Sequence, residues 1–281
     1  MGNTVKIKKF SLRALLYIVL VLWAFILFIP FAWMLLGSFK TTEEITEMGS
    51  IFPSQFNFDN YVDVFYRINF MQMIMNTAII TICGTIVQVA GSIVVAYGFA
   101  RFQYKYKNVF FMVLLATTML PWVVTMVPSY VIYAKIGWVN TYLPFIIPSM
   151  GGNALYIFMT RQFIMGIPKD LDEAATIDGC NSFRILLQIL VPLMLPVIAT
   201  ITIFCFVNYW SDFIGPSIYL RTQTKFTISQ GLQMMKNSMT ERTPWNAIMA
   251  GSVMFSIPMI IVFFSAQKAF VEGVVTTGLK V

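Results

Sequence analysis

Long uncharged apolar stretches alternate with short polar segments along the chain. A charged residue at the centre of a membrane helix costs about 3 kcal/mol, so the gaps between successive charges mark candidate spans. Six windows of 25 to 33 residues contain no Asp, Glu, Lys or Arg: 14–39, 68–100, 108–134, 136–160, 185–211 and 243–267. Since a spanning helix needs about 20 residues, the pattern predicts an all-α integral membrane protein with six transmembrane helices.

The predicted organisation is a single transmembrane domain over residues 1–281. The polar segments between the windows have about thirty residues at most, too few for an independent soluble domain. One of them, the loop 166–191, separates the fourth span from the fifth. The expected spans are 14–37, 72–99, 109–133, 141–160, 193–215 and 246–267.

The distribution of Lys and Arg predicts the orientation. Beside the predicted helix ends, twelve basic residues lie on the side of the N-terminus and seven on the opposite side. Because basic residues are enriched in cytoplasmic loops, both termini are expected in the cytoplasm. The basic start resembles a signal peptide, but the apolar stretch is too long and no A-x-A site follows, which favours a retained first helix.

Small residues and prolines suggest how the helices pack. Small-xxx-small spacings occur at Ser92, Ala96 and Ala100 and at Ala247 and Gly251, and they predict close helix packing. Prolines are expected to interrupt two spans, the third at Pro121 and Pro128 and the fourth at Pro144 and Pro148.

Composition excludes several classes of protein. Apolar residues make up 58% of the chain and charged residues 11%, well below the roughly 25% charge of soluble domains. The chain has no His and only three widely spaced Cys, so neither a metal site nor a catalytic residue is predicted. The net charge of +7 is interpreted as a topology signal, with no nucleic-acid partner expected.

The loop 166–191 holds the clearest local signals. Asp170 and Glu173 have the spacing of a capping box, and Gly179 lies where a helix would stop. They predict a helix of about nine residues, roughly 13 Å long and too short to span a membrane. Its face at i, i+3, i+4 and i+7 consists of Leu171, Ala174, Ala175 and Asp178. Such a helix could dock into a groove of another protein, or merely join two spans.

The segment Glu173-Ala-Ala-Thr-Ile-Asp-Gly179, with Pro192 and Pro196 after it, resembles the EAA loop of permease subunits of bacterial ABC importers. Further segments resemble the carbohydrate, maltose-transport-like branch, so the resemblance covers nearly the whole chain. They are Phe52-Pro53 to Asn60-Tyr61, Ala96-Tyr97 to Ala100-Arg101-Phe102, Gly137 to Thr141, Arg161-Gln162-Phe163 and Gln267 to Gly278.

The resemblance implies a division of labour between subunits. The short helix would dock on a cytoplasmic ATPase, with Glu173 making a polar contact, the alanines fitting the cleft and Gly179 allowing the turn. The coupling residues implied are Leu171, Asp172, Glu173, Ala174, Ala175, Asp178 and Gly179. The chain has no G-x-x-x-x-G-K-[ST] phosphate loop, so no cofactor is expected in it and ATP with Mg²⁺ would bind to partner subunits.

The same resemblance implies an assembly in the bacterial plasma membrane. The expected partners are a homologous second permease subunit, two ATPase subunits, an extracytoplasmic solute-binding protein and membrane lipid. The two permeases would together form a path for a sugar or oligosaccharide, so the chain itself would not be an enzyme.

Five residues are candidates for the translocation path: Asn76, Asn153, Asn208, Trp210 and Asp212. Asp212 beside aromatic residues could bind sugar hydroxyls or could lie at the membrane interface with Trp210 as an anchor. The asparagines could line a path or join helices. The family commonly has Trp-Asn-Asp/Glu-Phe here, whereas this chain has Trp-Ser-Asp-Phe at 210–213, so the role of that Asn cannot be assigned to Ser211.

Two other classes are less well supported. A secondary transporter usually keeps acidic residues in mid-membrane for ion coupling, and the six windows contain none. A membrane enzyme would need clustered ionisable groups, and the best cluster, at Asp170, Asp172, Glu173 and Asp178, is better explained in part by helix-end roles.

Overall fold

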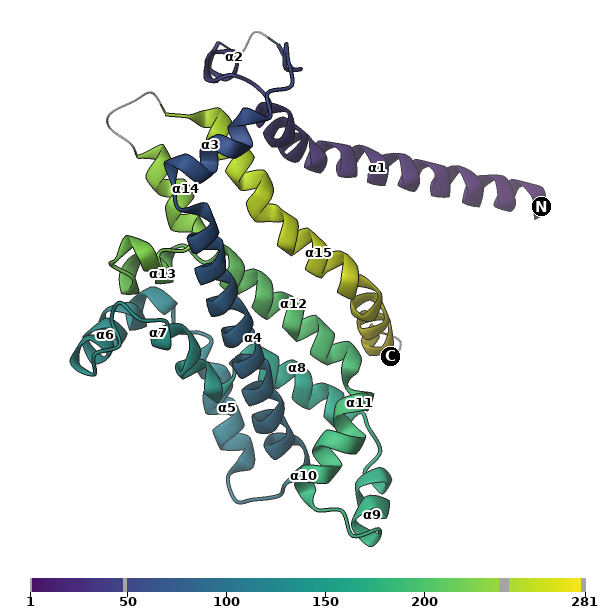
Figure 1. Ribbon diagram of the computed structural model, residues 1–281. Helices are drawn as coiled ribbons and strands as arrows, with labels where there is room; N and C mark the ends of the chain where they lie inside the picture. Colours follow the sequence, from purple (N-terminus) through teal and green to yellow (C-terminus); the bar gives the residue numbers. More distant parts are fainter. Residues whose placement is uncertain (1, 48–49, 238–242, 279–281) are drawn as a thin grey trace. The chain divides into compact units, whose positions relative to one another are not determined.

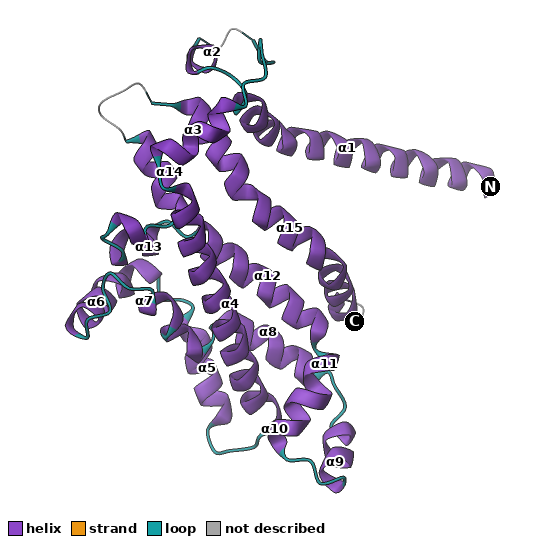
Figure 2. Ribbon diagram, viewed as in Figure 1, coloured by secondary structure: helices purple, strands orange, loops and turns teal. Residues whose placement is uncertain are grey.

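The computed structural model describes residues 2–47, 50–237 and 243–278, in which every regular element is a helix (Figures 1 and 2). The all-α class predicted from the sequence is confirmed. The chain forms two compact units, one from residues 1–68 and 232–255 and the other from residues 69–231 and 256–281.

Within the residues that the structure describes, four helical segments are long and apolar enough to cross a membrane, and up to six if each of two sharply bent pairs counts as one span. The four are Arg13–Gly37, Phe70–Arg101, Leu143–Met165 and Trp245–Ser265. The bent pairs are Lys107–Thr117 with Trp122–Lys135, at 94°, and Ser182–Leu193 with Leu195–Ser211, at 83°. The described residues thus contain several candidate membrane spans, and the predicted number of six is reached when each bent pair counts as one span.

A buried asparagine, Asn60, joins segments of the first unit. Its elements are α1 (Gly2–Gly37), α2 (Thr42–Thr46), α3 (Asp59–Arg67), the end of α14 (Ile228–Lys236) and the first part of α15 (Trp245–Gly278). The Asn60 amide donates to the carbonyls of Ser38 and Lys40, each at 2.8 Å, and accepts a hydrogen bond from Asn246. Gly251 lies against Leu232 and Val64, and Ala247 is buried, so the predicted small-residue packing of α15 is confirmed.

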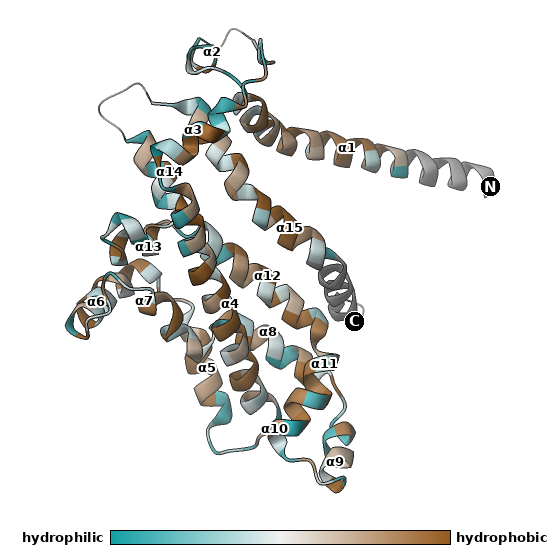
Figure 3. Cartoon of the chain, viewed as in Figure 1, coloured by the Kyte–Doolittle hydropathy of each residue, from teal (hydrophilic) through white to brown (hydrophobic). Residues whose placement is uncertain are grey.

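The second unit is built around α4 (Phe70–Arg101), which packs chiefly against α8 (Ala154–Met165) and α12 (Leu195–Ser211). Its remaining elements are α5 (Lys107–Thr117), α6 (Trp122–Lys135), α7 (Leu143–Ile146), η1 (Pro148–Gly151), α9 (Asp170–Ile177), α10 (Ser182–Arg184), η2 (Ile185–Leu190), α11 (Val191–Leu193), α13 (Ile214–Tyr219), η3 (Gln223–Lys225), the start of α14 and the end of α15. Figure 3 shows that α4 is apolar along most of its length.

The packing face of α4 consists of small residues. Ser92, Ala96 and Ala100 are all buried, as their spacing predicted. Ile157 of α8 and Ile201 of α12 are fully buried in the same cluster. Small side chains let the helix backbones approach closely, which provides dispersion contacts where lipid offers no hydrophobic driving force.

Prolines break the spans at two of the four expected places: Pro121 precedes α6, and Pro148 begins η1. The expectation is wrong for Pro144, which lies in the first turn of α7, and for Pro128, which lies inside α6 without ending it. The fifth window bends at Met194, between α11 and α12, where Pro196 lies in the first turn of α12.

Gly152 is required where the chain enters α8. Its φ of +76° is in the left-handed region, and a Cβ there would lie 2.8 Å from the backbone of Ser92. The Ser92 hydroxyl accepts a hydrogen bond from the Asn153 amide at 3.1 Å, which fixes the crossing of α4 with this segment.

Replacing Gly152 with Val is expected to lower the free energy of unfolding by about 2 kcal/mol or more, from the left-handed strain and the backbone clash. Thermal unfolding of the detergent-solubilised protein measures the change. Gly98→Ala on α4 is the control, because a Cβ at Gly98 meets nothing within 4 Å. Equal melting temperatures for wild type and Gly152→Val would contradict the packing.

Candidate functional site

Two regions of the second unit carry the residues with functional signals: the helix α9 and a pocket beside α6 and α13. The helix α9 begins at Asp170, one residue after its N-cap, Lys169. Lys169 makes no side-chain capping hydrogen bond, so the predicted capping box at Asp170 and Glu173 is wrong. The three acidic residues of the first turn still favour this helix start electrostatically, because the N-terminal end carries partial positive charge.

The predicted stop at Gly179 is confirmed. Gly179 has a φ of +83°, and its amide donates to the Thr176 carbonyl at 3.1 Å. The next amide, of Cys180, donates to the Ala175 carbonyl at 2.9 Å, which completes a Schellman motif. A side chain at Gly179 would meet no neighbour, so only the left-handed backbone calls for glycine here.

One face of α9 is anchored to the transmembrane bundle. The Asp172 carboxylate lies 2.6 Å from the Arg101 guanidinium at the end of α4, and the two side chains are 18% and 7% exposed. Arg101 also donates to the Ile167 carbonyl at 3.1 Å. Ala175 is buried in the cluster that includes Leu190. Asp172 and Ala175 therefore belong to the inner face of α9.

The other face of α9 is free of contacts with the bundle. Leu171, Glu173, Ala174, Asp178 and Gly179 are exposed, as a docking surface requires. The predicted face of Leu171, Ala174, Ala175 and Asp178 is therefore divided, because Ala175 points inward.

Sequence reasoning missed Ile177. Its side chain is 88% exposed at the last turn of α9, six residues after Leu171 and three after Ala174. Leu171 and Ile177 together give the outer face of α9 two exposed apolar side chains. The signal that could have identified it is the i, i+3 and i+6 spacing of Leu171, Ala174 and Ile177 along the helix.

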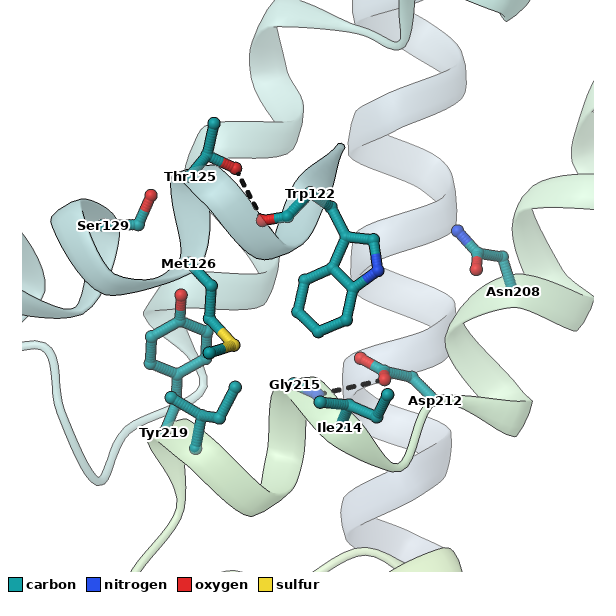
Figure 4. A pocket seen from close by; sticks show the side chains of 10 residues that line it. Trp122, Thr125, Met126, Ser129, Asn208, Asp212, Ile214, Gly215 and Tyr219 are labelled. Carbon is teal, nitrogen blue, oxygen red and sulfur yellow. Dashed lines mark hydrogen bonds between the residues drawn. The ribbon is translucent and has the colours of Figure 1, made fainter. Parts of the chain in front are cut away.

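The second region is a pocket of about 470 Å³, here called the Trp122 pocket (Figure 4). Its volume is within the roughly 300–1,000 Å³ of small-molecule sites. Three elements and the turn before α13 contribute to it. The lining residues are Trp122, Thr125, Met126 and Ser129 of α6, Asn208 of α12, Asp212, and Ile214, Gly215, Ile218 and Tyr219 of α13.

Polar groups and aromatic rings face the Trp122 pocket together. Figure 4 shows the Trp122 indole above the turn at Asp212 to Gly215, with the Asn208 side chain at the right. The Asn208 side-chain amide makes no hydrogen bond to any described residue, so it can both donate and accept. This combination of apolar rings with carboxylate, amide and hydroxyl groups suits a neutral, hydroxyl-rich solute.

Local structure positions Asp212 and Tyr219. The Gly215 amide donates to Asp212 Oδ1 at 3.1 Å, and the Ser229 hydroxyl donates to the Asp212 carbonyl at 2.8 Å. Asn140, at φ +62°, accepts hydrogen bonds from the amides of Arg221 and Thr222 and fixes the segment after α13. Asn140, which fixes this side of the pocket, thus belongs to the segment Gly137 to Thr141 that resembles the carbohydrate permeases.

Of the five candidate path residues, the structure brings Asn208 and Asp212 together in the Trp122 pocket. Trp210 is buried and its ring stacks on Phe206 with centroids 5.5 Å apart. Asn76 donates to the carbonyls of Thr224 and Phe226, and Asn153 accepts from the Leu155 amide at the start of α8. These three have structural contacts away from the pocket, and their place in a path stays a prediction.

Trp122 and Tyr219 were not predicted as site residues. Both lie in apolar stretches rich in aromatic residues, where nothing in the sequence separates a pocket-facing ring from a packing ring. Tyr219 also packs edge-on against Tyr133 and Phe145, with centroids 5.4 and 5.8 Å apart, so its ring is held in place by neighbours.

Comparisons with known proteins agree with this architecture. Residues 88–276 match the family model of the binding-protein-dependent transport system inner membrane component. The chain is 32% identical over 261 residues to the arabinooligosaccharides transport system permease protein AraQ of Halalkalibacterium halodurans, covering 92% of each chain. It is 31% identical over 252 residues to the probable ABC transporter permease protein YurM of Bacillus subtilis, covering 89% of this chain and 83% of that protein.

A solved structure shares the fold. It is a chain of a bacterial ABC transporter involved in the import of the acidic polysaccharide alginate, with a TM-score of 0.81 and 22% identity. The match covers 90% of this chain and 94% of the other.

Proposed function

The chain belongs to the family of binding-protein-dependent transport system inner membrane components, and on this premise we propose that it is the permease subunit of a carbohydrate importer. The relatives named for arabinooligosaccharide and lactose transport support a sugar or oligosaccharide as the solute. The observation that carries the proposal is the family match over residues 88–276 together with an exposed face on α9.

The proposed coupling element is α9. Its inner face is fixed to α4 by the Arg101–Asp172 ion pair, and its outer face presents Leu171, Ala174 and Ile177. An ATPase subunit that binds the outer face would move α9, and the ion pair would transmit that movement to α4. Glu173, exposed beside this face, is placed to make a polar contact with the ATPase.

The proposed assembly contains a second permease, two ATPase subunits that bind ATP with Mg²⁺, and an extracytoplasmic binding protein. A structural relative with 15% identity and a TM-score of 0.68 belongs to an alginate transporter in complex with a pentasaccharide-bound periplasmic protein. The shared fold supports a transporter that works with a binding protein. The assembly of the present chain with these partners is our proposal.

A pull-down from native membranes in mild detergent, with the co-purifying proteins identified, tests the assembly. A P-loop ATPase and a second permease are the expected partners. Recovery of this chain alone, also after crosslinking, would contradict the proposal and favour a stand-alone transporter.

Both termini are proposed to lie in the cytoplasm of a bacterial cell, on the basis of the Lys and Arg distribution. A cysteine-containing tag at either end should therefore resist a membrane-impermeant thiol reagent in intact cells and react after lysis. Reaction in intact cells at either end would overturn the orientation.

We further propose that the Trp122 pocket contacts the sugar during translocation. Trp122→Ala removes the half-exposed indole, and we expect transport to fall about tenfold because stacking and apolar contact are lost. Uptake of radiolabelled oligosaccharides by a strain lacking the native gene measures the effect. Trp33→Ala on α1 is the matched control, and equal loss in both variants would contradict a specific contact.

A further inference from the structure

A second pocket of the second unit has an unusual charge. It has a volume of about 370 Å³ and lies where α4 ends, α5 begins and α8 leads into α9. We call it the basic pocket. Its lining residues are Ala100, Arg101, Gln103, Lys107, Arg161, Met165, Gly166, Ile167, Pro168 and Lys169.

Four cationic side chains face the basic pocket, and none of its lining residues is acidic. Arg101 has a carboxylate partner, Asp172. Lys107 donates to the Phe102 carbonyl at 2.8 Å, and Arg161 donates to the Phe99 carbonyl at 3.3 Å, so these two bond only neutral groups. The Lys169 ammonium makes no hydrogen bond or ion pair with any described residue. Three positive charges thus converge without a counter-charge.

The N–H donors in the basic pocket that bond no protein group are suited to binding a phosphate. Arg161 lies over the Phe111 ring at 4.2 Å, which fixes its planar guanidinium while most of its N–H groups stay unused. A guanidinium recognises phosphate through paired hydrogen bonds, and a nearby ammonium adds a mobile positive charge. An anion in the pocket would offset the mutual repulsion of the three cations.

The surroundings favour a lipid as the source of the phosphate. The pocket lies at the ends of apolar candidate spans, the depth at which headgroups are found. Exposed Met165 lines the pocket, and further exposed aromatic side chains lie within four positions of its lining residues in the sequence and could contact acyl chains and glycerol: Phe102, Tyr104, Tyr106 and Phe110. Basic pockets between membrane helices with such neighbours suit anionic headgroups.

We propose that the basic pocket binds the phosphate of an anionic phospholipid, held by Lys107, Arg161 and Lys169. Arg101 adjoins the same pocket and pairs with Asp172 of α9, so the bound lipid would lie beside the contact that anchors α9. The lining of the basic pocket shares no residue with the Trp122 pocket, and it meets α9 at the N-cap residue Lys169.

The test measures lipid binding by the full chain, purified with its co-purifying subunits and delipidated. Nanodiscs and native mass spectrometry compare phosphatidylglycerol with phosphatidylcholine for the wild type and for the triple variant Lys107→Gln, Arg161→Gln, Lys169→Gln. We expect the triple variant to bind phosphatidylglycerol at least tenfold more weakly, with phosphatidylcholine unchanged. The control variant Lys135→Gln, Arg221→Gln, Lys236→Gln has the same net charge and should bind like the wild type.

Lys169→Gln alone guards against misfolding, because this exposed side chain has no bonded partner among the described residues; we expect about a threefold loss. Inorganic phosphate at millimolar concentration distinguishes a soluble source, since saturation by phosphate alone would assign the pocket to a free anion and overturn the lipid assignment. Equal phosphatidylglycerol binding by wild type and triple variant, or equal loss in the control variant, would overturn the site itself.

Discussion

Replacing Ile177 with lysine is expected to reduce sugar uptake at least tenfold while leaving membrane insertion intact. Burying an isoleucine contributes about 1.5–3 kcal/mol, and Ile177 is 88% exposed in this chain, so that contribution is available to a partner. A lysine near the C-terminal end of α9 interacts favourably with the partial negative charge of the helix dipole there, so the helix should stay folded. The substitution should therefore weaken only the binding of the ATPase subunit to α9.

Uptake of radiolabelled oligosaccharide and the amount of ATPase recovered with the tagged permease are the two measurements. Ile177→Leu keeps an apolar side chain of the same size and is the control. Normal recovery of the ATPase with Ile177→Lys would show that this face of α9 does not dock.

Breaking the ion pair between Arg101 and Asp172 should have the second large effect. Asp172→Leu leaves a guanidinium that is only 7% exposed without its carboxylate, and removing one partner of a buried pair costs about 3–5 kcal/mol. If the variant lowers the free energy of local opening of α9 by this amount, the backbone amides of α9 should exchange with deuterium about 100-fold faster. Transport should fall with it, because movement of α9 would no longer reach α4.

Hydrogen exchange of residues 171–178, followed by mass spectrometry, measures this anchoring. The double variant Arg101→Met, Asp172→Leu should recover much of the protection, since an apolar pair avoids an uncompensated charge. Asp63→Leu breaks a pair with Arg67 in which both side chains are about one third exposed, and it should change the stability by less than about 1 kcal/mol. Unchanged exchange in Asp172→Leu would show that the ion pair does not hold α9.

The distribution of charges was sufficient to predict the helical membrane class, and the six predicted spans equal the upper limit of the four to six candidates in the described residues. Hydrocarbon excludes charge whatever the tertiary arrangement, so uncharged windows of sufficient length mark helices directly. Gly179 was equally predictable, because a left-handed residue after a helix is nearly always glycine.

Two kinds of local sequence signal, capping-box spacing and proline, did not by themselves predict where helices start or break. Asp170 and Glu173 have capping-box spacing, but α9 starts one position earlier than the box requires, and Lys169 occupies the N-cap. Pro128 is accommodated inside α6, whereas Pro121 coincides with a 94° bend. A proline tells where a helix is weakened, and the packing of its neighbours decides whether it breaks.

By itself, the sequence determined the class of the molecule, the position of its short polar helix and its family resemblance, because these depend on solvent preference and local backbone geometry. Only the tertiary structure decided that Asp172 faces Arg101, that Ile177 faces outward, and that Trp122 and Tyr219 join Asn208 and Asp212 around one pocket. Asp172 and Arg101 are about 70 positions apart, and Trp122 and Tyr219 about 100. The physical reason is that periodicity gives a helix its faces but does not say which neighbour covers each face.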